Sequence, residues 1–378
     1  MSNAVWQYTA PGRLSTTLTA STRPIPTPGP GEVVVGVKAA ALNPVDEQLA
    51  QSSPRLLKFI GATEPSETSP LTPSSDFAGV ITAVGDGVTQ FTVGDEVYGQ
   101  RFSADGNGFL AEYVCIPASA PFIHKPAGLD WAQAAAVPLV YSTVYDALVV
   151  WGRLPFDPTD EDKAKQRTVL VLGGSSGTGS AAIQLARKMG LRVAATCSAA
   201  NAELVKSLGA EEVIDYTTED VTARALASPL APFAEILDCV GGTDLVPHLD
   251  ALILADAAAP QLGVYVTIVG DKTSRDAMGG AVTNLYYPAQ AIRTLKGVVG
   301  EYLPNWIPGP LRSLVAGKRY ACIRLVPTKD KLATYESFMA AGGKITLDST
   351  HEFAQAKAAY ERLESGRARG KVVVQVAK

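Results

Sequence analysis

One stretch of the 378-residue sequence, residues 169–184 (VLVLGGSSGTGSAAIQ), constrains the fold more than any other. It joins a continuous apolar run to a helical pattern through a loop of glycine and small hydroxyl residues. A pyrophosphate group needs close backbone approach and free N–H groups at a helix N-terminus, and such a loop supplies both. The spacing is G-x-x-G-x-G instead of the commoner G-x-G-x-x-G, and an ordinary structural turn is the alternative interpretation. The residues predicted to bind the phosphates of a dinucleotide are Gly174, Ser175, Ser176, Gly177, Thr178 and Gly179.

The sequence around this loop alternates continuous apolar runs with helical patterns, which favours the phosphate-binding interpretation. Strands are expected at residues 168–172, 192–196, 212–215, 236–240 and 264–269, and helices at residues 181–189 and 202–208. This alternation is typical of a parallel sheet with helices on both faces. Residues 138–327 are therefore predicted to form a doubly wound α/β domain of the Rossmann type. Residues 320–326 (YACIRLV) are predicted to be its edge strand.

The two ends of the chain have a different pattern. The first third is rich in Pro and Gly and contains short β-rich runs at residues 32–40, 79–84 and 96–99, which predicts a small irregular β-barrel in residues 1–137. A short helix is expected at residues 56–59. Residues 328–378 are predicted to fold back and complete this barrel domain, with helices at residues 331–341 and 353–364 and strands at residues 345–347 and 372–376.

Composition excludes several classes of function. Thirty-three Lys and Arg against thirty-seven Asp and Glu give a formal charge of −4 without a basic run, so nucleic acid is not expected as a partner. No apolar stretch approaches the roughly 20 residues that span a bilayer, and the N-terminus MSNAVWQYTA has no signal-peptide pattern. We expect a cytoplasmic protein without membrane association, with an organellar variant left open. The four Cys and three His are scattered, so no metal site is predicted.

The choice between NADH and NADPH is expected at the end of the strand at residues 192–196. NAD-binding proteins place an Asp or Glu there to bind the ribose 2′-hydroxyl, whereas this sequence continues CSAAN. Ser198 and Asn201 could donate hydrogen bonds to a 2′-phosphate, and Tyr216, after the next strand, could reach it. An ordinary polar loop is the alternative. The sequence therefore predicts NADPH as the cofactor.

Five motifs resemble the medium-chain dehydrogenase/reductase superfamily, within it the zinc-independent quinone oxidoreductase and enoyl reductase branch. They are LNPVD at residues 42–46, SDFAGV at 75–80, VGDEVYG at 93–99, the phosphate loop, and ARGKVVV at 368–374. The sequence is similar to reticulon-4-interacting-protein-like oxidoreductases and to the trans-acting enoyl reductases of fungal polyketide synthases. The resemblance implies a GroES-like β-barrel catalytic domain made from both chain ends, and a cofactor cleft between it and the Rossmann domain.

Zinc-dependent alcohol dehydrogenases of this superfamily place a metal-binding Cys where this sequence has Asn43 and a metal-binding His where it has Ser75. Neither residue is a good zinc ligand, and residues 100–113, where the structural-zinc cysteines would stand, contain no Cys. Without zinc, the Lewis acid that polarises a ketone or alcohol oxygen is missing. This pattern argues against alcohol oxidation.

Placement alone can supply several kcal/mol of a hydride-transfer barrier, which suits an activated C=C bond of an enone or enoyl group, or a quinone. By resemblance, Asn43 and Thr143 are candidate catalytic residues, and a turn former before Pro44 is the alternative role for Asn43. Tyr141 and Tyr145 could donate a proton, but aromatic residues at that spacing are more often packing residues. The resemblance also assigns Asp46, Val269, Gly270 and Lys371 to the cofactor site. For Asp46, a role as a buried structural partner is the favoured alternative.

Two other functions remain open at this stage. One is a carbonyl reductase that acts on ketones, and the other is a non-catalytic protein that binds NADPH as a sensor. The expected partner is a small-molecule enone, quinone or enoyl thioester, and a polyketide synthase would present the last of these. An uncovered edge strand at residues 320–326 invites pairing with a second copy, so a homodimer is a further hypothesis.

Overall fold

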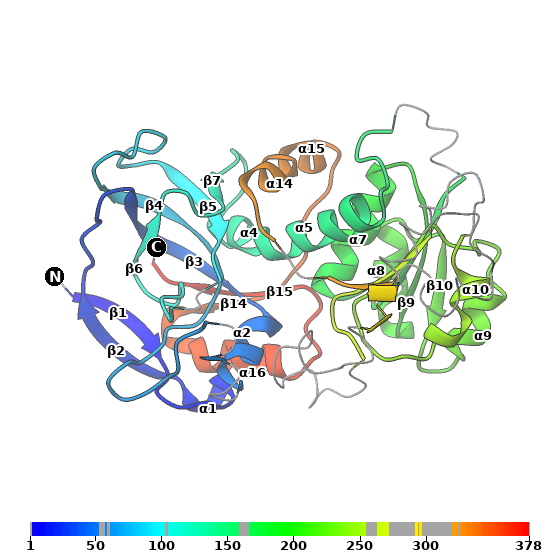
Figure 1. The fold of residues 1–378 in the computed structure, drawn as a ribbon, viewed down its shortest axis with the longest axis horizontal. Coiled ribbons are helices and arrows are strands. Elements are labelled where there is room, and N and C mark those ends of the chain that lie inside the picture. The colour runs from blue at the N-terminus through cyan, green and yellow to red at the C-terminus, as the bar shows by residue number, and fades with distance from the viewer. Residues whose placement is uncertain are drawn as a thin grey trace.

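The computed structural model shows two lobes, and both chain ends lie in one of them (Figure 1). The residues that the structure describes are 2–52, 57–58, 61–102, 105–158, 166–254, 263–271, 292–293, 295–296, 320–323 and 326–377. Within these ranges, no helix is long and apolar enough to cross a membrane.

One lobe is built on a six-stranded sheet with the strand order β10-β9-β8-β11-β12-β13, and all of its pairings are parallel. The strands are β8 (Thr168–Leu172), β9 (Arg192–Cys197), β10 (Glu212–Asp215), β11 (Glu235–Asp238), β12 (Val264–Thr267) and β13 (Tyr320–Cys322). The order reverses next to β8, as in a doubly wound sheet, so the prediction of this fold is confirmed. The carboxyl end of β8 lies at this reversal, where such sheets bind their ligands.

Helices cover both faces of this sheet because alternate strand residues point to opposite sides. Val169 and Val171 of β8 pack with the helices α5 and α7, whereas Leu170 and Leu172 pack with α9 and α10. The helical segments of this lobe are α5 (Pro138–Tyr145), η1 (Asp146–Trp151), α7 (Gly177–Lys188), η2 (Ala199–Asn201), α8 (Ala202–Ser207), α9 (Val221–Leu226), η3 (Val246–His248) and α10 (Leu249–Leu252).

The second lobe is a curved, largely antiparallel sheet with the strand order β14-β15-β3-β4-β5-β7, in which β6 also pairs with β3. The strands are β3 (Glu32–Leu42), β4 (Asp76–Val84), β5 (Glu96–Gln100), β6 (Tyr113–Pro117), β7 (Phe122–His124), β14 (Leu347–Glu352) and β15 (Lys371–Gln375). The last strand of the chain runs antiparallel to β3, with Val372 opposite Leu42. This register brings Lys371 next to the residues that follow β3.

Shorter elements complete the barrel lobe and the junction between the lobes. They are the hairpin β1 (Ser2–Gln7) and β2 (Thr19–Pro24), the helices α1 (Leu14–Thr17), α2 (Pro44–Ala50), α4 (Trp131–Ala136), α14 (Lys329–Ala333), α15 (Tyr335–Ala340) and α16 (Ala356–Glu364), and the turn η5 (Phe353–Gln355). Figure 1 shows α14 and α15 beside α5, between the two lobes.

Several predicted element boundaries differ from the structure. The single helix expected at residues 331–341 is split into α14 and α15 at Thr334. The strand expected at residues 345–347 begins at Leu347 and continues to Glu352. Helix α7 begins four residues earlier than expected, since Ser176 caps it. Of the helix expected at residues 56–59, only residues 57 and 58 are described, and both are helical.

Candidate active site

The phosphate loop leaves β8 through Gly173, whose φ of 80° lies in the left-handed region that favours glycine. Two hydrogen bonds tie this turn to β9: Gly173 N–H donates to the Thr196 hydroxyl at 2.9 Å and Gly174 N–H donates to the Thr196 carbonyl at 2.8 Å. The Ser176 Oγ then caps α7 by accepting from Gly179 N–H at 3.0 Å. The predicted loop is therefore a fixed turn that opens a helix N-terminus.

Glycine is required at position 179 by a close backbone contact. A Cβ on Gly179 would lie 2.2 Å from the Gly173 carbonyl oxygen, so a side chain there would push the helix away from the strand. A Cβ on Gly177 would lie 3.5 Å from the backbone of Gly370, the residue before Lys371. The phosphate loop of one lobe thus contacts the start of the last strand of the other. This open cradle of small residues fits the pyrophosphate of a dinucleotide.

The residues predicted to bind a 2′-phosphate gather at the end of β9. The Asn201 side-chain amide donates to the Ser175 hydroxyl at 3.2 Å and to the Ser198 hydroxyl at 3.3 Å. Each serine oxygen accepts from Asn201, and in the parts of the chain that the structure describes each O–H group can still donate to an anion. Tyr216 lies on the surface with 56% of its area exposed.

The predicted nicotinamide contacts at the end of β12 form a tight turn. Val269 N–H and Gly270 N–H both donate to the Thr267 hydroxyl, at 3.2 Å and 2.8 Å. The Gly270 carbonyl accepts from Gly242 N–H at 3.1 Å. The two N–H groups are satisfied within the turn and the Gly270 carbonyl by Gly242, which follows β11, so this turn is fixed by the protein itself.

A buried polar cluster lies where β3, β4 and β15 meet. It consists of Asn43, Asp46, Ser75, Asp76 and Lys371, all less than 5% exposed. The Lys371 ammonium donates to the Asn43 Oδ1 and, at 3.1 Å, to the Asp76 Oδ2. The Asn43 Nδ2 donates to the same Asp76 oxygen at 3.0 Å. We name these five residues the Lys371 cluster.

Asp46 has a different set of partners in the Lys371 cluster. Asp46 lies in the first turn of α2, where its carboxylate accepts from the N–H of the capping residue Asn43 at 2.9 Å. It also accepts from the Ser75 hydroxyl at 2.7 Å. Burial raises the pKa of Asp46 from 3.8 to about 7, and the neighbouring Asp76 adds to the rise, while the hydrogen bonds and Lys371 oppose it. Burial also raises the pKa of Asp76, against the opposing charge of Lys371.

The donor set of the Lys371 cluster does not fit zinc. Asn43 and Ser75 supply neutral oxygen atoms where the metal-dependent members of the superfamily supply sulfur and nitrogen. The Asn43 and Asp76 oxygens that could bind a metal are already occupied by the Lys371 ammonium. Within the described ranges, no group of three or more His, Cys, Asp and Glu side chains is placed to hold a metal ion.

The two predicted residues of α5 have different surroundings. The start of α5 joins the Lys371 cluster, since Leu139 N–H donates to the Asp76 Oδ1 at 3.1 Å, and the Thr143 hydroxyl donates to the Leu139 carbonyl at 2.7 Å. The Tyr141 hydroxyl instead hydrogen-bonds Thr334 at 2.9 Å. The Tyr141 ring is fully buried among aromatic rings of α15, and burial raises the pKa of its hydroxyl. This placement favours packing over proton donation for Tyr141.

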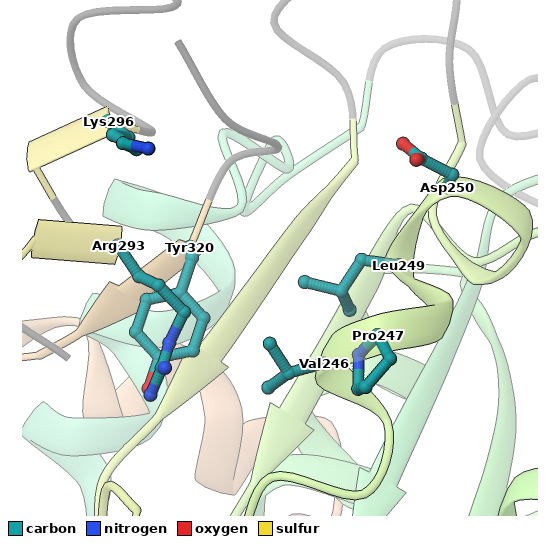
Figure 2. Close-up of a pocket in the computed structure, with 7 residues that line it drawn as sticks. All are labelled: Val246, Pro247, Leu249, Asp250, Arg293, Lys296 and Tyr320. Carbon is teal, nitrogen blue, oxygen red and sulfur yellow. The ribbon is translucent and has the colours of Figure 1, made fainter. Parts of the chain in front are cut away.

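A separate pocket of about 180 Å³ lies beside α10 and β13, on the face of the six-stranded sheet that α9 and α10 cover. Figure 2 shows the Arg293 side chain alongside the ring of Tyr320, facing Val246 and Pro247 across the pocket. The Arg293 guanidinium lies 5.0 Å from the centre of that ring and pairs with Asp271. None of the seven residues that line this pocket belongs to the Lys371 cluster, so the two are separate.

Comparison with known proteins defines the class. The alcohol dehydrogenase GroES-like domain family matches residues 29–127, and the zinc-binding dehydrogenase family matches residues 208–374. The chain belongs to the medium-chain dehydrogenase/reductase superfamily. It is an oxidoreductase with a GroES-like domain and a Rossmann-type domain, as the sequence motifs predicted.

Individual relatives place it more closely. It is 32% identical to the trans-enoyl reductase pgmF of Aspergillus terreus, over 92% of this chain and 87% of that protein. It is 31% identical to the mitochondrial NAD(P)H oxidoreductase RTN4IP1 of Homo sapiens, over 92% and 82%. The structure of the quinone oxidoreductase from Coxiella burnetii matches with a TM-score of 0.74 and 25% identity, over the full length of both chains.

Sequence reasoning did not include Asp76 or Leu139 among the site residues. Asp76 was visible only as part of the SDFAGV motif, and a buried Asp within a β-rich run was the available signal. Leu139 contributes through its backbone N–H, which no side-chain pattern reveals. Both residues were found because the fold brings them to the same carboxylate.

Proposed function

We propose that this protein is an NADPH-dependent reductase that transfers a hydride, without zinc, to an activated C=C bond of an enone or enoyl group or to a quinone. The observation that carries the proposal is the Lys371 cluster, in which Asn43 and Ser75 take the positions of the zinc-binding Cys and His, and a buried ammonium donates to Asn43 and Asp76. One relative is named as an enoyl reductase and one similar structure as a quinone oxidoreductase, which supports an activated C=C bond or a quinone as the acceptor.

The phosphate cradle supports a nicotinamide dinucleotide, and the end of β9 supports the phosphorylated form. Within the part of the chain that the structure describes, the Ser175 and Ser198 hydroxyls can still donate to an anion, and residues 198–201 contain no carboxylate. Asp215 lies opposite Cys197 on β10, where its carboxylate accepts from the Thr217 and Thr218 hydroxyls. Tyr216 offers a further exposed hydroxyl on the neighbouring strand end. These hydroxyl groups are neutral, so the preference for NADPH over NADH rests on hydrogen bonds rather than on an ion pair.

When bound, the reduced nicotinamide supplies the hydride. The chain has to hold the acceptor carbon close to it and stabilise the negative charge that develops on the acceptor oxygen. Among the described residues, Lys371 donates to Asn43 and Asp76, which leaves the third of its ammonium hydrogens for a ligand oxygen. Asn43 holds this ammonium, and Thr143 lies on the next turn of the helix that Asp76 anchors. Water is the proposed source of the proton that the α-carbon takes up after the hydride has been added.

A panel assay tests the proposal. Loss of nicotinamide absorbance is followed in metal-free buffer with enones, quinones, enoyl thioesters and simple ketones, each with NADPH and with NADH. Turnover of one of the first three classes with NADPH, unchanged after dialysis against a chelator, is the expected result. A reaction that needs stoichiometric zinc would refute the proposal.

Two other functions are separated by the same panel. Turnover of simple ketones alone would identify a carbonyl reductase. Tight NADPH binding with no turnover of any acceptor would identify a binding protein or sensor. A homodimer, if formed, would use β13, which has one partner strand among the described residues and lies at the sheet edge. Sedimentation at micromolar concentration tests this.

A further inference from the structure

One carboxylate, that of Asp76, joins three parts of the chain that contribute predicted site residues. Its Oδ2 accepts from the Asn43 side chain at 3.0 Å and from the Lys371 ammonium at 3.1 Å. Its Oδ1 accepts from Leu139 N–H at 3.1 Å, in the first turn of α5. Asp76 is itself completely buried and lies at the start of β4.

Each of these contacts fixes a group that could otherwise turn. The Asn43 amide can point either way, and acceptance of its Nδ2 hydrogen by Asp76 leaves the Oδ1 directed at Lys371. The long Lys371 side chain loses its freedom because Asp76 and Asn43 both accept from it. The backbone hydrogen bond to Leu139 sets the start of the helix that carries Thr143. Asp76 thereby fixes two side chains of one lobe against a helix of the other.

We propose that Asp76 is the positioning residue of this site. It orients Lys371 so that the third ammonium hydrogen can reach the ligand, and it fixes Asn43 and the start of α5 relative to Lys371. This inference rests on the proposed function for the identity of the ligand. It assigns no contact with the ligand to Asp76 itself, which acts through Lys371 and Asn43.

The charge of Asp76 is needed as well as its shape. In Asp76→Asn, the side-chain oxygen can still accept from Leu139, but an amide N–H would then face the donors of Lys371 and Asn43. The new amide N–H cannot accept a hydrogen bond from Lys371, so the buried ammonium loses one of its two acceptors. The ammonium is therefore expected to turn away, while the start of α5 keeps its hydrogen bond.

A double-mutant cycle over Asp76→Asn and Lys371→Met tests this mechanism. Two quantities are measured for each variant: the dissociation constant of NADPH by fluorescence titration, and the single-turnover rate of hydride transfer at saturating NADPH. Asp76→Asn is expected to slow the transfer about 10- to 100-fold, as a misplaced group does. The double variant is expected to be no worse than Lys371→Met alone, within about threefold, because Asp76 acts on a group that is already absent.

The chain offers a matched control in another Lys–Asp pair, the partly buried Lys331 and the buried Asp146, whose charged atoms lie 2.5 Å apart. Its side chains are 15% and 6% exposed, against 5% and 0% for Lys371 and Asp76. The corresponding variants, Asp146→Asn and Lys331→Met, are expected to change both measured quantities less than about twofold, even where they lower the melting temperature.

The outcomes are distinct. Coupling at Asp76 and Lys371, with none at the control pair, supports the inference. The inference would be overturned if the double variant slowed hydride transfer by the product of the two single-variant factors. It would also be overturned if Asp76→Asn left the rate of hydride transfer unchanged. If Asp76→Asn alone does not fold, the comparison of Lys371→Met with the double variant still decides, because the double variant has no ammonium without a partner.

Failure of the proposed function is recognised separately. In that case the wild-type protein oxidises NADPH with none of the acceptors. The coupling between Asp76 and Lys371 can still be measured in the dissociation constant of NADPH, and its absence there would refute the positioning role on its own.

Discussion

Replacement of Asp46 by Asn should make the protein more stable near neutral pH. The Asp46 carboxyl is completely buried, and burial raises its pKa from 3.8 to about 7. Because the folded state binds this proton more tightly than the unfolded state does, the stabilisation is complete below pH 3.8. It is lost as the pH rises toward and through about 7. An Asn side chain resembles the protonated acid: its oxygen can accept from Asn43 N–H, and its amide can donate to the Ser75 hydroxyl.

The size of the effect follows from the same pKa. Each pKa unit corresponds to about 1.4 kcal/mol, so a rise from 3.8 to about 7 corresponds to roughly 4 kcal/mol as an upper bound. The free energy of unfolding of Asp46→Asn, minus that of the wild type, should therefore increase by up to about 4 kcal/mol between pH 4 and pH 8. Glu47, whose pKa is raised to about 8, is present in both proteins, and its contribution largely cancels in the difference.

Urea unfolding at intervals of half a pH unit, followed by circular dichroism, measures this difference. The sign is decisive, because a carboxylate stabilised mainly by Lys371 would have a lowered pKa and the wild type would gain stability as the pH rises. A difference that stays flat from pH 4 to pH 8, or that falls, would show that desolvation does not dominate at Asp46. The reasoning about the Lys371 cluster would then be refuted.

Three further predictions concern single residues. Gly179→Ala places a methyl group 2.2 Å from the Gly173 carbonyl oxygen, and NADPH affinity measured by fluorescence titration should fall at least about tenfold, whereas unchanged affinity would remove the close-contact argument. Ser198→Asp puts a carboxylate beside the proposed 2′-phosphate, so the ratio of NADPH to NADH affinity should drop by about 10-fold or more, and an unchanged ratio would move that site elsewhere. Tyr141→Phe removes the hydrogen bond to Thr334, so it should lower the free energy of unfolding by about 1 kcal/mol and leave turnover within about twofold; a large loss of turnover would restore Tyr141 as a proton donor.

Local patterns in the sequence were sufficient for much of the fold. The phosphate loop could be recognised because a strand, a glycine turn and a helix cap are adjacent in the chain, and their geometry depends on neighbours within a few residues. The alternation of apolar runs and helical patterns predicted the parallel sheet for the same reason. The absence of Cys and His at positions 43 and 75 could also be seen directly, once the flanking motifs set the register of the superfamily.

Only the tertiary structure decided which of these residues meet. Asp76 and Lys371 are separated by 295 positions, and Tyr141 and Thr334 by 193. The first contact exists because β15 runs antiparallel to β3 in one register, and a slip of one residue would turn Lys371 to the opposite face of the sheet. No local pattern encodes that register, because it is set by the packing of the whole barrel. The sequence therefore determined the chemistry that is available, and the fold determined that one buried carboxylate brings it together.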